Sequence, residues 1–304
     1  MIVITDNKEY ADSAFTNGPD WLEVNLSRIE PNLRYVAERL FSNRPIHQAT
    51  AVINGCWRYA FLVKDAPASQ YDLMVECSGQ QREFPDGIIC LAGSGRDFHG
   101  QRGRPWDTRP GNIHLTAYLS PNRPIEHFHI GFSLLAAVSV IDTIDSLEPL
   151  AGRAQIKWVN DILINGAKVA GFLANTTSLA STVTSAVLGI GLNVETTPQV
   201  PADDITPSAA SLRDFAADSA MCHQKGVLNH LLAHLDTNYR LLLSGQCDRL
   251  LAIYRERSLV IGRHVTVVSD APNGRKQHIA AGRVQRIGDN LELFLEGVTE
   301  PVTR

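Results

Sequence analysis

The sequence predicts an α/β (α+β) domain followed by a small all-β module, and two observations lead to this prediction. From Thr50 to about residue 257, short apolar runs typical of buried strands alternate with longer runs at helical spacing. After Ser258, strand-like runs separated by turn-forming residues replace the helical pattern. We therefore expect an N-terminal extension over residues 1–50, a large α/β domain over residues 51–257, and the β-module over residues 258–304.

The N-terminal extension is mostly polar and predicts one amphipathic helix. Its apolar residues recur at helical spacing only in the run from Ile29 to Phe41, as Leu33, Val36, Ala37, Leu40 and Phe41. A second periodic segment does not follow a short turn, so the region does not predict a helix-turn-helix. The net charge of −4 and the lack of a basic recognition segment argue against a DNA-binding protein.

The α/β domain is predicted from runs that differ in length and periodicity. Short apolar runs bounded by turn formers predict strands at residues 58–63, 87–92, 154–158, 162–164, 168–174 and 183–188. Longer runs predict a nearly all-apolar core helix at residues 127–145 and further helices at residues 226–243 and 246–256. Asn165-Gly166 favours a two-residue hairpin turn, because both residue types tolerate a positive φ.

The C-terminal module of about 45 residues predicts only strands, at residues 265–268, 279–287 and 291–295. Turn formers separate them at Pro272-Asn273-Gly274 and at Gly288-Asp289-Asn290. A module of this size buries too little apolar surface to be stable alone. We therefore expect Val265, Val267 and Leu293 to pack partly against the α/β domain.

Composition indicates a soluble cytoplasmic protein. The five cysteines are odd in number and show no CxxC spacing, which predicts reduced thiols that mainly fill the interior. Apolar runs stay short of the ~20 residues that a membrane span needs. The N-terminus lacks the basic and apolar regions of a signal peptide.

A glycine- and arginine-rich segment from Ala92 to Trp106 is the first candidate for chemistry. It contains the glycines and arginines Gly93, Gly95, Gly100, Gly103, Arg96, Arg102 and Arg104. Glycines let the backbone approach a ligand and expose N–H groups, and arginines bind phosphate or carboxylate through bidentate hydrogen bonds. We expect this segment to be mobile until an anion arrives, because its arginines repel one another. A flexible surface loop with solvated charges is the alternative interpretation.

The second candidate is Lys157, which lies between Ile156 and Trp158 in a predicted strand. Burial of an unpaired ammonium is costly, so Lys157 should face an anion or a cleft. An exposed position on an edge strand is the alternative. Asn160 and Asp161 would end this strand, where α/β sheets bind ligands, or they would form a turn.

The third candidate is a strand-like run, Gly189-Ile190-Gly191-Leu192-Asn193, that carries two glycines. A strand with two glycines leaves its backbone uncovered, which suits a ligand lying against it. A β-bulge is the alternative reading of the same glycines.

These segments resemble, in order and composition, the biotin–protein ligase (biotin–[acetyl-CoA-carboxylase] ligase) family. That family has a glycine/arginine loop ending in Gly-Arg-x-Trp, then Lys-Trp-Pro-Asn-Asp, Gly-x-x-x-Ala-Gly-Ile-Leu and Gly-Ile-Gly-x-Asn. The chain has Gly103-Arg104-Pro105-Trp106, Lys157-Trp158-Val159-Asn160-Asp161, Lys168-Val169-Ala170-Gly171-Phe172-Leu173 and Gly189-Ile190-Gly191-Leu192-Asn193. The resemblance spans about residues 60–297. It implies a biotin/lipoate-ligase-like domain with a mixed sheet and a C-terminal SH3-like β-barrel, without an N-terminal DNA-binding domain.

The chain departs from the family pattern in the glycine/arginine loop. An ungapped alignment from Trp106 puts the family's Gly-Arg-Gly-Arg on Phe98-His99-Gly100-Gln101, which loses both arginines. An insertion of five residues, Asp97–Gln101, instead matches Ala92–Arg96 to Ala-Gly-Arg-Gly-Arg and keeps Arg96, and we prefer this alignment. The family's glutamine before the loop is absent, since Cys90-Leu91 stands there, and its motif proline is Val159.

The resemblance implies a reaction in two steps. The carboxylate of biotin attacks the α-phosphate of ATP to give biotinyl-5'-AMP and pyrophosphate, and a lysine of a biotin carboxyl carrier protein then attacks the mixed anhydride. Two anions meet in the first step, so the site needs fixed cations and Mg²⁺. The resemblance assigns no residue to the metal and leaves a homodimer open. The N-terminal region and the short apolar runs described above argue against DNA and membrane as partners.

The resemblance also implies a role for each candidate residue. Lys157 would bridge the carboxylate and the α-phosphate, and Arg96 and Arg104 would act with it as catalytic cations. The remaining residues would bind biotin or the adenylate: Ser69, Gln70, Gly93, Gly95, Gly100, Arg102, Trp106, Asn160, Asp161, Gly171, Gly189, Gly191 and Asn193. Ser69 and Gln70 would stand where the family has a Ser-Thr pair that touches the biotin ring.

Two other functions are compatible with the same residues. A lipoate– or octanoate–protein ligase uses the same type of fold, although the C-terminal module and Gly-Ile-Gly-Leu-Asn favour biotin. A non-catalytic relative that binds biotin or biotinyl-AMP as a sensor would explain the missing arginine and glutamine, because fold alone does not imply function.

Overall fold

The structure is a computed structural model that describes the 304-residue chain except for residues 81, 83, 201–206, 217, 271–275 and 304. Its main sheet has the strand order β2-β3-β1-β4-β5-β6-β11-β10-β9-β8, and β7 pairs with β11 off this path. The pairs β1–β4 and β4–β5 are parallel and the others are antiparallel, so the predicted mixed sheet is confirmed. The bounds are β1 Ile2–Thr5, β2 Leu22–Val24, β3 Ile46–Thr50, β4 Tyr59–Ala66, β5 Ile88–Gly95, β6 Ile113–Leu119, β7 Arg123–Pro124, β8 Ala154–Lys157, β9 Asp161–Ile164, β10 Ala167–Leu179 and β11 Thr182–Leu192.

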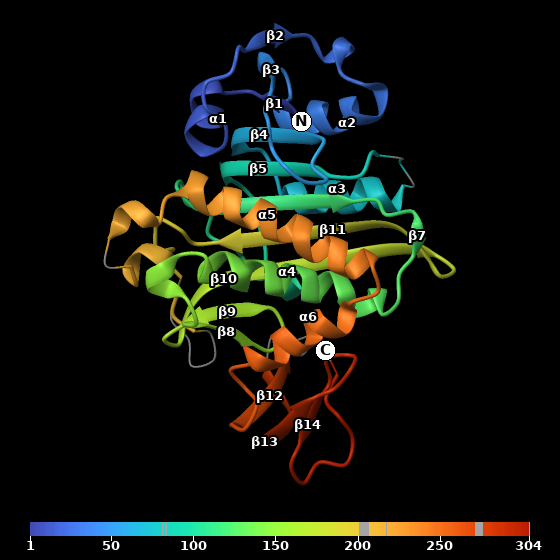
Figure 1. Ribbon diagram of the computed structural model, residues 1–304, viewed down its shortest axis with the longest axis vertical. Helices are drawn as coiled ribbons and strands as arrows, with labels where there is room; N and C mark the ends of the chain where they lie inside the picture. The colour runs from blue at the N-terminus through green and yellow to red at the C-terminus, as the bar shows by residue number, and fades with distance from the viewer. Residues whose placement is uncertain (81, 83, 201–206, 217, 271–275, 304) are drawn as a thin grey trace.

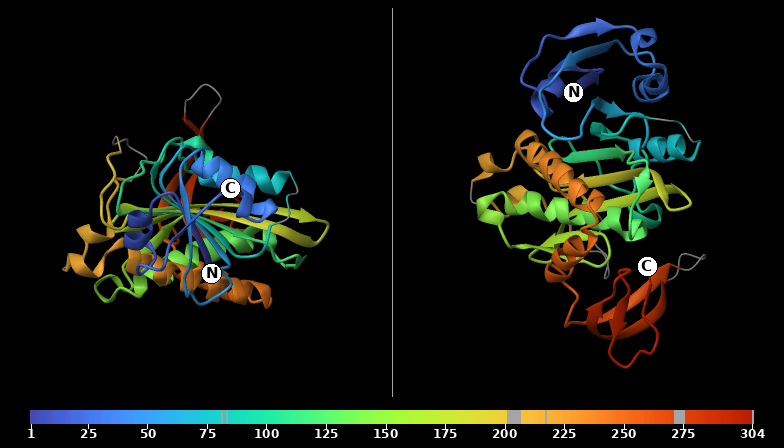
Figure 2. Two further views of the ribbon diagram at one scale, coloured as in Figure 1. Left: turned by 90° about the horizontal axis from the view of Figure 1, so that it is seen from above. Right: turned by 45° about the vertical axis from the view of Figure 1, so that its right-hand side comes forward.

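Helices cover both faces of this sheet (Figure 1, Figure 2). Helices α1, α4, α5 and α6 pack on one face in the larger hydrophobic cluster, and α2 and α3 pack on the other face in a second cluster. The bounds are α1 Lys8–Ala14, α2 Pro31–Phe41, α3 Gln70–Gly79, α4 Phe128–Asp145, α5 Gln224–Leu243 and α6 Cys247–Glu256. Short 3₁₀ turns occur at η1 Leu26–Arg28, η2 Gln101–Gly103, η3 Glu148–Leu150, η4 Leu212–Asp214 and η5 Ser219–Met221.

The apolar helix predicted at residues 127–145 is α4, the central helix of the larger cluster. By length and composition α4 would also pass as a membrane span, but 72% of its 18-residue window is buried inside the protein. It packs against α5, α6 and the strands β8, β10 and β11. Its apolar surface is therefore explained by the protein's own interior.

The N-terminal extension differs from the single helix that its periodicity predicts. It holds α1 in addition to the expected helix α2, and it contributes β1, β2 and β3 to the main sheet. Strand β1 lies between β3 and β4, and Val3 and Ile4 are buried on opposite faces. These strands have three to five residues, too few for alternation to be recognised without their pairing partners.

The predicted hairpin at Asn165-Gly166 is confirmed between β9 and β10. Both residues have positive φ, 50° and 84°, as the two-residue turn requires. Strands β10 and β11 are longer than their apolar runs, because their polar ends are paired with each other.

The C-terminal module forms a three-stranded antiparallel sheet, β12-β13-β14, below the main sheet (Figure 1). Its strands are β12 His264–Asp270, β13 Lys276–Ile287 and β14 Leu293–Leu295, and the turn expected at Pro272-Asn273-Gly274 lies outside the described residues. Leu293 is buried in the larger cluster, and Val265 and Val267 are partly buried against it, as expected. The Trp158 Nε1–H group donates to the carbonyl oxygen of Leu291 at 2.7 Å, which fastens the module beside β8.

Candidate active site

A cavity of about 1120 Å³ lies between the main sheet and the C-terminal module. Its wall on the sheet side comes from β6, β10 and β11, and its opposite wall comes from β12, β13 and the C-terminal segment. The predicted site residues that line it are Ser69, Gly100, Arg102, Arg104, Trp106, Lys157, Asn160, Asp161, Gly171, Gly189 and Gly191. Predicted site residues up to 122 positions apart in sequence, Ser69 and Gly191, therefore share one cavity.

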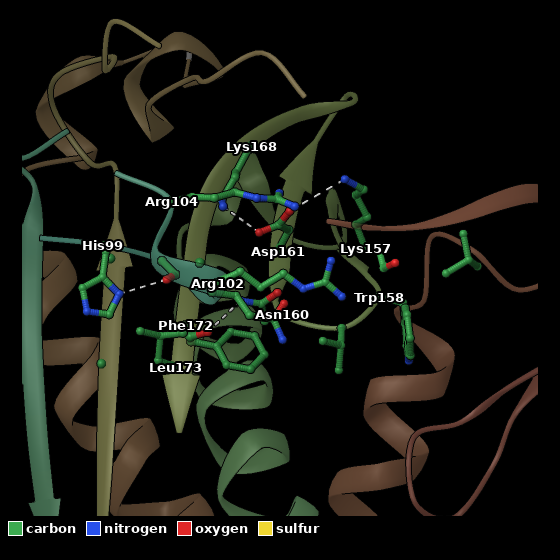
Figure 3. A pocket seen from close by; sticks show the side chains of 18 of the residues that line it. His99, Arg102, Arg104, Lys157, Trp158, Asn160, Asp161, Lys168, Phe172 and Leu173 are labelled. Atoms are coloured by element: carbon green, nitrogen blue, oxygen red, sulfur yellow. Dashed lines mark hydrogen bonds and ion pairs between the residues drawn. The ribbon is translucent and has the colours of Figure 1, made fainter. Parts of the chain in front are cut away.

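The polar centre of the cavity is Asp161, which holds two lysines (Figure 3). The Lys168 Nζ atom lies 2.6 Å from one carboxylate oxygen, and the Lys157 Nζ atom lies 3.8 Å from the other. The sheet register explains the Lys157 contact, because Asp161 pairs with Lys157 across β8–β9. Across β9–β10, Asp161 pairs with Gly171, and the end of the Lys168 side chain lies beside this glycine. One carboxylate between two ammonium groups leaves the group with net positive charge.

Asn160 lines the cavity but also holds the backbone together. Its Nδ2–H group donates to the carbonyl oxygen of Phe172 at 2.9 Å, and the Phe172 N–H group donates back to the Asn160 carbonyl oxygen at 3.2 Å. The peptide bond between Trp158 and Val159 is cis. Asn160 thus lies in a turn and also lines the cavity, which are the two positions that the sequence offered as alternatives.

Aromatic side chains cover the glycine strands. A Cβ atom on Gly191 would lie 2.4 Å from the indole of Trp106, and one on Gly171 would lie 3.5 Å from it. A Cβ atom on Gly189 would lie 2.9 Å from the ring of Tyr71. Glycine is needed at 189 and 191 because Tyr71 and Trp106 lie directly against the backbone of β11.

A buried histidine orients Trp106. The Trp106 Nε1–H group donates to His114 Nδ1 at 3.3 Å, and His114 Nε2–H donates to the carbonyl oxygen of Arg109 at 3.2 Å. This arrangement requires the neutral imidazole with its proton on Nε2. Burial lowers the pKa of His114 to about 4, although the Arg109 carbonyl favours the charged form. His114 is therefore a neutral hydrogen-bond acceptor near neutral pH.

Gly93, Gly95 and Arg96, which were predicted to act at the site, do not line the cavity. A Cβ atom on Gly93 would lie 2.7 Å from the Lys64 carbonyl oxygen, and one on Gly95 would lie 2.5 Å from the Phe98 ring. These glycines thus admit neighbouring chain atoms at the end of β5. Arg96 is exposed, whereas residues 98–102 line the cavity.

Gln70 and Asn193 also lie outside the cavity lining, and both are buried. The Asn193 Nδ2–H group donates to the carbonyl oxygen of Ala210 at 3.0 Å, which fixes the 208–212 segment beside β11. The Gln70 amide has neither Nε2 nor Oε1 paired with a protein group. Its neighbour Ser69 lines the cavity and caps α3, accepting from the Asp72 N–H group at 3.3 Å.

Several cavity residues were not singled out from the sequence: Tyr71, Phe98, His99, His114, Thr116, Lys168, Phe172 and Leu173. Lys168 could have been found, because it begins a predicted strand and stands between Ala167 and Val169, as Lys157 stands between Ile156 and Trp158. The others required the strand register, which brings His114 opposite Gly191 and Thr116 opposite Gly189. Within the described part of the chain, no group of three or more His, Cys, Asp or Glu side chains is placed to hold a metal ion.

Comparisons with known proteins find similarity to biotin and lipoate ligases. Residues 72–193 match the model of the biotin/lipoate A/B protein ligase family. The chain is 30% identical to the bifunctional ligase/repressor BirA of Bacillus subtilis over 60% of this chain and 54% of that protein. It is 28% identical to the biotin–[acetyl-CoA-carboxylase] ligase of Mycobacterium tuberculosis, over 79% of this chain and 84% of that protein.

A solved structure shares the fold. The biotin protein ligase of Aquifex aeolicus, in complex with biotin and ATP, superposes with a TM-score of 0.60 at 18% identity, over 79% of this chain and 92% of that one. The chain spans about half the length of the Bacillus subtilis relative, 54%. The segment of residues 72–193, which carries Trp106, Lys157, Gly171 and Gly191, is the part of the chain that matches the biotin/lipoate A/B protein ligase family.

Proposed function

We propose that the chain activates biotin with ATP and transfers the biotinyl group to a lysine of a biotin carboxyl carrier protein. The observation that carries this proposal is the convergence of four cationic side chains on one cavity: Lys157 and Lys168 at Asp161, and Arg102 and Arg104 in the glycine/arginine segment. Such a grouping suits a reaction in which a carboxylate must approach a phosphate. The cavity volume of about 1120 Å³ exceeds that of a typical single-ligand pocket and has room for an acid and a nucleotide together.

In the first step, an oxygen of the biotin carboxylate forms a bond to the α-phosphorus of ATP while the bond to pyrophosphate breaks. Lys157 would bridge the two reacting anions, and Arg102 and Arg104 would hold phosphate oxygens. In the second step, the carrier lysine forms the amide, AMP leaves with the electron pair of the anhydride bond, and the lysine loses a proton. This step needs no protein nucleophile, since proximity and the activated acyl group suffice.

Magnesium would enter with the nucleotide. The cavity carboxylate Asp161 is already engaged by two lysines. Mg²⁺ at such sites is held mainly by substrate phosphates and water, with one or two carboxylates. Asp161 would therefore be at most an outer partner of the ion, which supplies charge neutralisation between the phosphates.

We further propose a domain organisation, a cellular compartment and an oligomeric state for the chain. Residues 51–257 form the ligase domain, and the sheet of residues 258–304 is its SH3-like β-domain. Residues 1–50 extend the ligase sheet. We propose that the chain acts in the cytoplasm on a carrier protein and not on DNA. A homodimer is compatible with this arrangement.

The test is acyl transfer followed by mass spectrometry. The protein is incubated with ATP, Mg²⁺, a carrier domain, and biotin and lipoate in competition. We expect a mass increase on one carrier lysine that corresponds to biotin, and exchange of labelled pyrophosphate into ATP that depends on biotin. Lipoylation would replace the proposed substrate, and binding of biotin without any exchange would establish the non-catalytic relative instead.

A further inference from the structure

The segment from Phe98 to Trp106 forms a hairpin along one side of the cavity, here called the 98–106 hairpin. The Trp106 N–H group donates to the Phe98 carbonyl oxygen at 2.9 Å, and the Gly100 N–H group donates to the Arg104 carbonyl oxygen at 2.7 Å. At its tip, Arg102 and Gly103 have positive φ, 61° and 70°. These bonds make the hairpin a preformed unit, so its placement depends on how its two arms are attached.

The two arms are attached by different chemistry. The Trp106 arm packs on Gly191 and donates to His114, as described above. The His99 arm reaches helix α3, where His99 Nε2 lies 2.9 Å and 3.0 Å from the two carboxylate oxygens of Asp72. The ring of Tyr71 meets His99 edge-on at 6.5 Å between centroids.

Both ring nitrogens of His99 face acceptors. Nε2 faces the Asp72 carboxylate, and Nδ1 lies 3.0 Å from the carbonyl oxygen of Gly100 (Figure 3). Only the doubly protonated imidazolium donates from both nitrogens at once. The Gly100 carbonyl and then Asp72 raise the pKa of His99, against the effect of burial.

Other ionisable groups share this environment. Asp72 and Tyr71 face His99 from α3, and burial raises the pKa of Tyr71 to about 12, so its ring stays neutral. Arg102 and Arg104 belong to the same hairpin, and Lys157 and Lys168 line the same cavity. The positive charges of these side chains disfavour the protonated form of His99, and the negative charge of Asp72 favours it.

We propose that His99 and Asp72 form a latch that holds the 98–106 hairpin against helix α3 and thereby sets how long a bound acyl-adenylate stays enclosed. His99 is a positioning residue in this proposal, since its ring nitrogens are engaged with the protein. The identity of the enclosed ligand rests on the proposed function, but the latch is a property of the chain without ligand. It also revises the expectation that the segment waits for an anion before it is held.

The expected size of the effect follows from exposure. The side chain of Asp72 is 52% exposed and that of His99 is 30% exposed, so solvent screens the pair. Exposed ion pairs change an equilibrium by about two- to five-fold, which corresponds to ~0.4–1 kcal/mol. The latch therefore shifts the equilibrium toward the hairpin that is attached to α3, but a detached hairpin remains populated.

The first experiment measures amide hydrogen exchange in the 98–106 hairpin of the ligand-free protein at about pH 6. Asp72→Asn should speed exchange at Gly100 and Trp106 by about two- to five-fold, because a hairpin released from α3 also breaks its internal bonds to Arg104 and Phe98 more often. Glu76→Gln is the matched control, since Glu76 lies one turn further along α3 and pairs with Tyr35 and Arg39 on α2. Equal exchange in the wild type and Asp72→Asn would overturn the latch.

A double-mutant cycle separates the latch from an effect on α3, because Asp72 also lies in the first turn of that helix. His99→Gln alone should speed exchange as Asp72→Asn does, and the double variant should be no faster than either. Asp72→Glu, which keeps the charge, should retain most of the protection. After correction for intrinsic rates, the wild type should approach the variants as pH rises above ~6.5 and through the raised pKa of His99. Additive effects of the two substitutions, or a pH-independent difference, would contradict the proposal.

A second readout is the release rate of biotinyl-AMP, which should rise by about two- to five-fold in Asp72→Asn and His99→Gln. If the wild type forms no biotinyl-AMP, the proposed function fails, while the exchange result still decides the latch. If biotinyl-AMP forms but its release and the hairpin exchange are both insensitive to these substitutions, the latch fails and the proposed function stands.

Discussion

At the scale of single residues, the cavity is organised by one carboxylate shared between two lysines. Asp161 binds Lys168 at 2.6 Å and Lys157 at the longer distance of 3.8 Å. The pair with Lys168 is therefore the closer of the two ion pairs at this carboxylate. Both lysines come from strand ends whose positions the sheet register fixes.

Lys157→Ala should abolish adenylate formation and leave the fold intact. Loss of one cation that acts in the transition state costs ~3 kcal/mol or more, a rate decrease of at least about 100-fold. The measurement is pyrophosphate exchange at saturating biotin and ATP, with circular dichroism as the check on folding. Lys64→Ala is the control, because Lys64 is exposed on β4. Near-normal exchange in Lys157→Ala would remove Lys157 from the proposed reaction.

His114 should make stability depend on pH in the acidic range. Burial lowers the pKa of His114 to about 4 in the folded chain, whereas its pKa in the unfolded chain is ~6.5. As the pH falls below ~6.5, the unfolded chain therefore binds a proton at His114 before the folded chain does. Stability is therefore complete at neutral pH and falls as the pH drops below ~6.5, by ~2 kcal/mol at about pH 5. Denaturant unfolding at about pH 7 and pH 5 measures this loss, and His114→Gln should show a smaller one. Identical pH dependence in the two proteins would rule out His114 as the cause.

At the scale of elements, the sequence predicts long segments well and short ones poorly. The helices α4, α5 and α6 follow from sustained apolar periodicity, and the turn at Asn165-Gly166 follows from residue type. Strand β1 and helix α1 are too short to stand out from a polar background, and only their pairing and packing partners define them. Lys157, Trp106 and Gly191 were found in the sequence as motif residues. His99 and His114 were not, because their roles depend on Asp72 and Trp106, which are close only in the folded chain.

Truncation after residue 258 should remove solubility or activity. The cut deletes Val284, Ile287, Leu291 and Leu293, which are buried in the larger hydrophobic cluster, and it removes the Leu291 carbonyl that accepts from Trp158. It also removes one wall of the cavity. Sedimentation and pyrophosphate exchange on the truncated chain measure the loss. A soluble and fully active truncated protein would show that the C-terminal sheet is dispensable.

At the scale of the whole molecule, residues 1–50 are part of one continuous sheet. Strand β1 pairs in parallel with β4, so its removal exposes the backbone of a long, apolar strand. Removal of residues 1–50 also takes Val3, Ile4, Leu33 and Phe41 out of the two hydrophobic clusters.

Deletion of residues 1–50 should therefore cause aggregation, because an exposed flat edge pairs with other chains. Soluble yield and light scattering after expression measure this outcome. Leu22→Lys is the control, since Leu22 is 68% exposed on the outer strand β2 and its replacement should change stability by less than ~0.5 kcal/mol. A monomeric, soluble deletion variant would show that β4 tolerates a free edge.

The contact between Trp106 and Gly191 has a consequence for how this chain can change over generations. A single methyl group at 191 would collide with the indole, since the added carbon would lie 2.4 Å from it. A smaller side chain at 106 would leave an empty volume over the bare strand, which is also costly. A substitution at either position is therefore costly by itself, and it is tolerated when the other position changes as well. Positions 106 and 191, although 85 residues apart, are expected to be inherited as a co-varying pair.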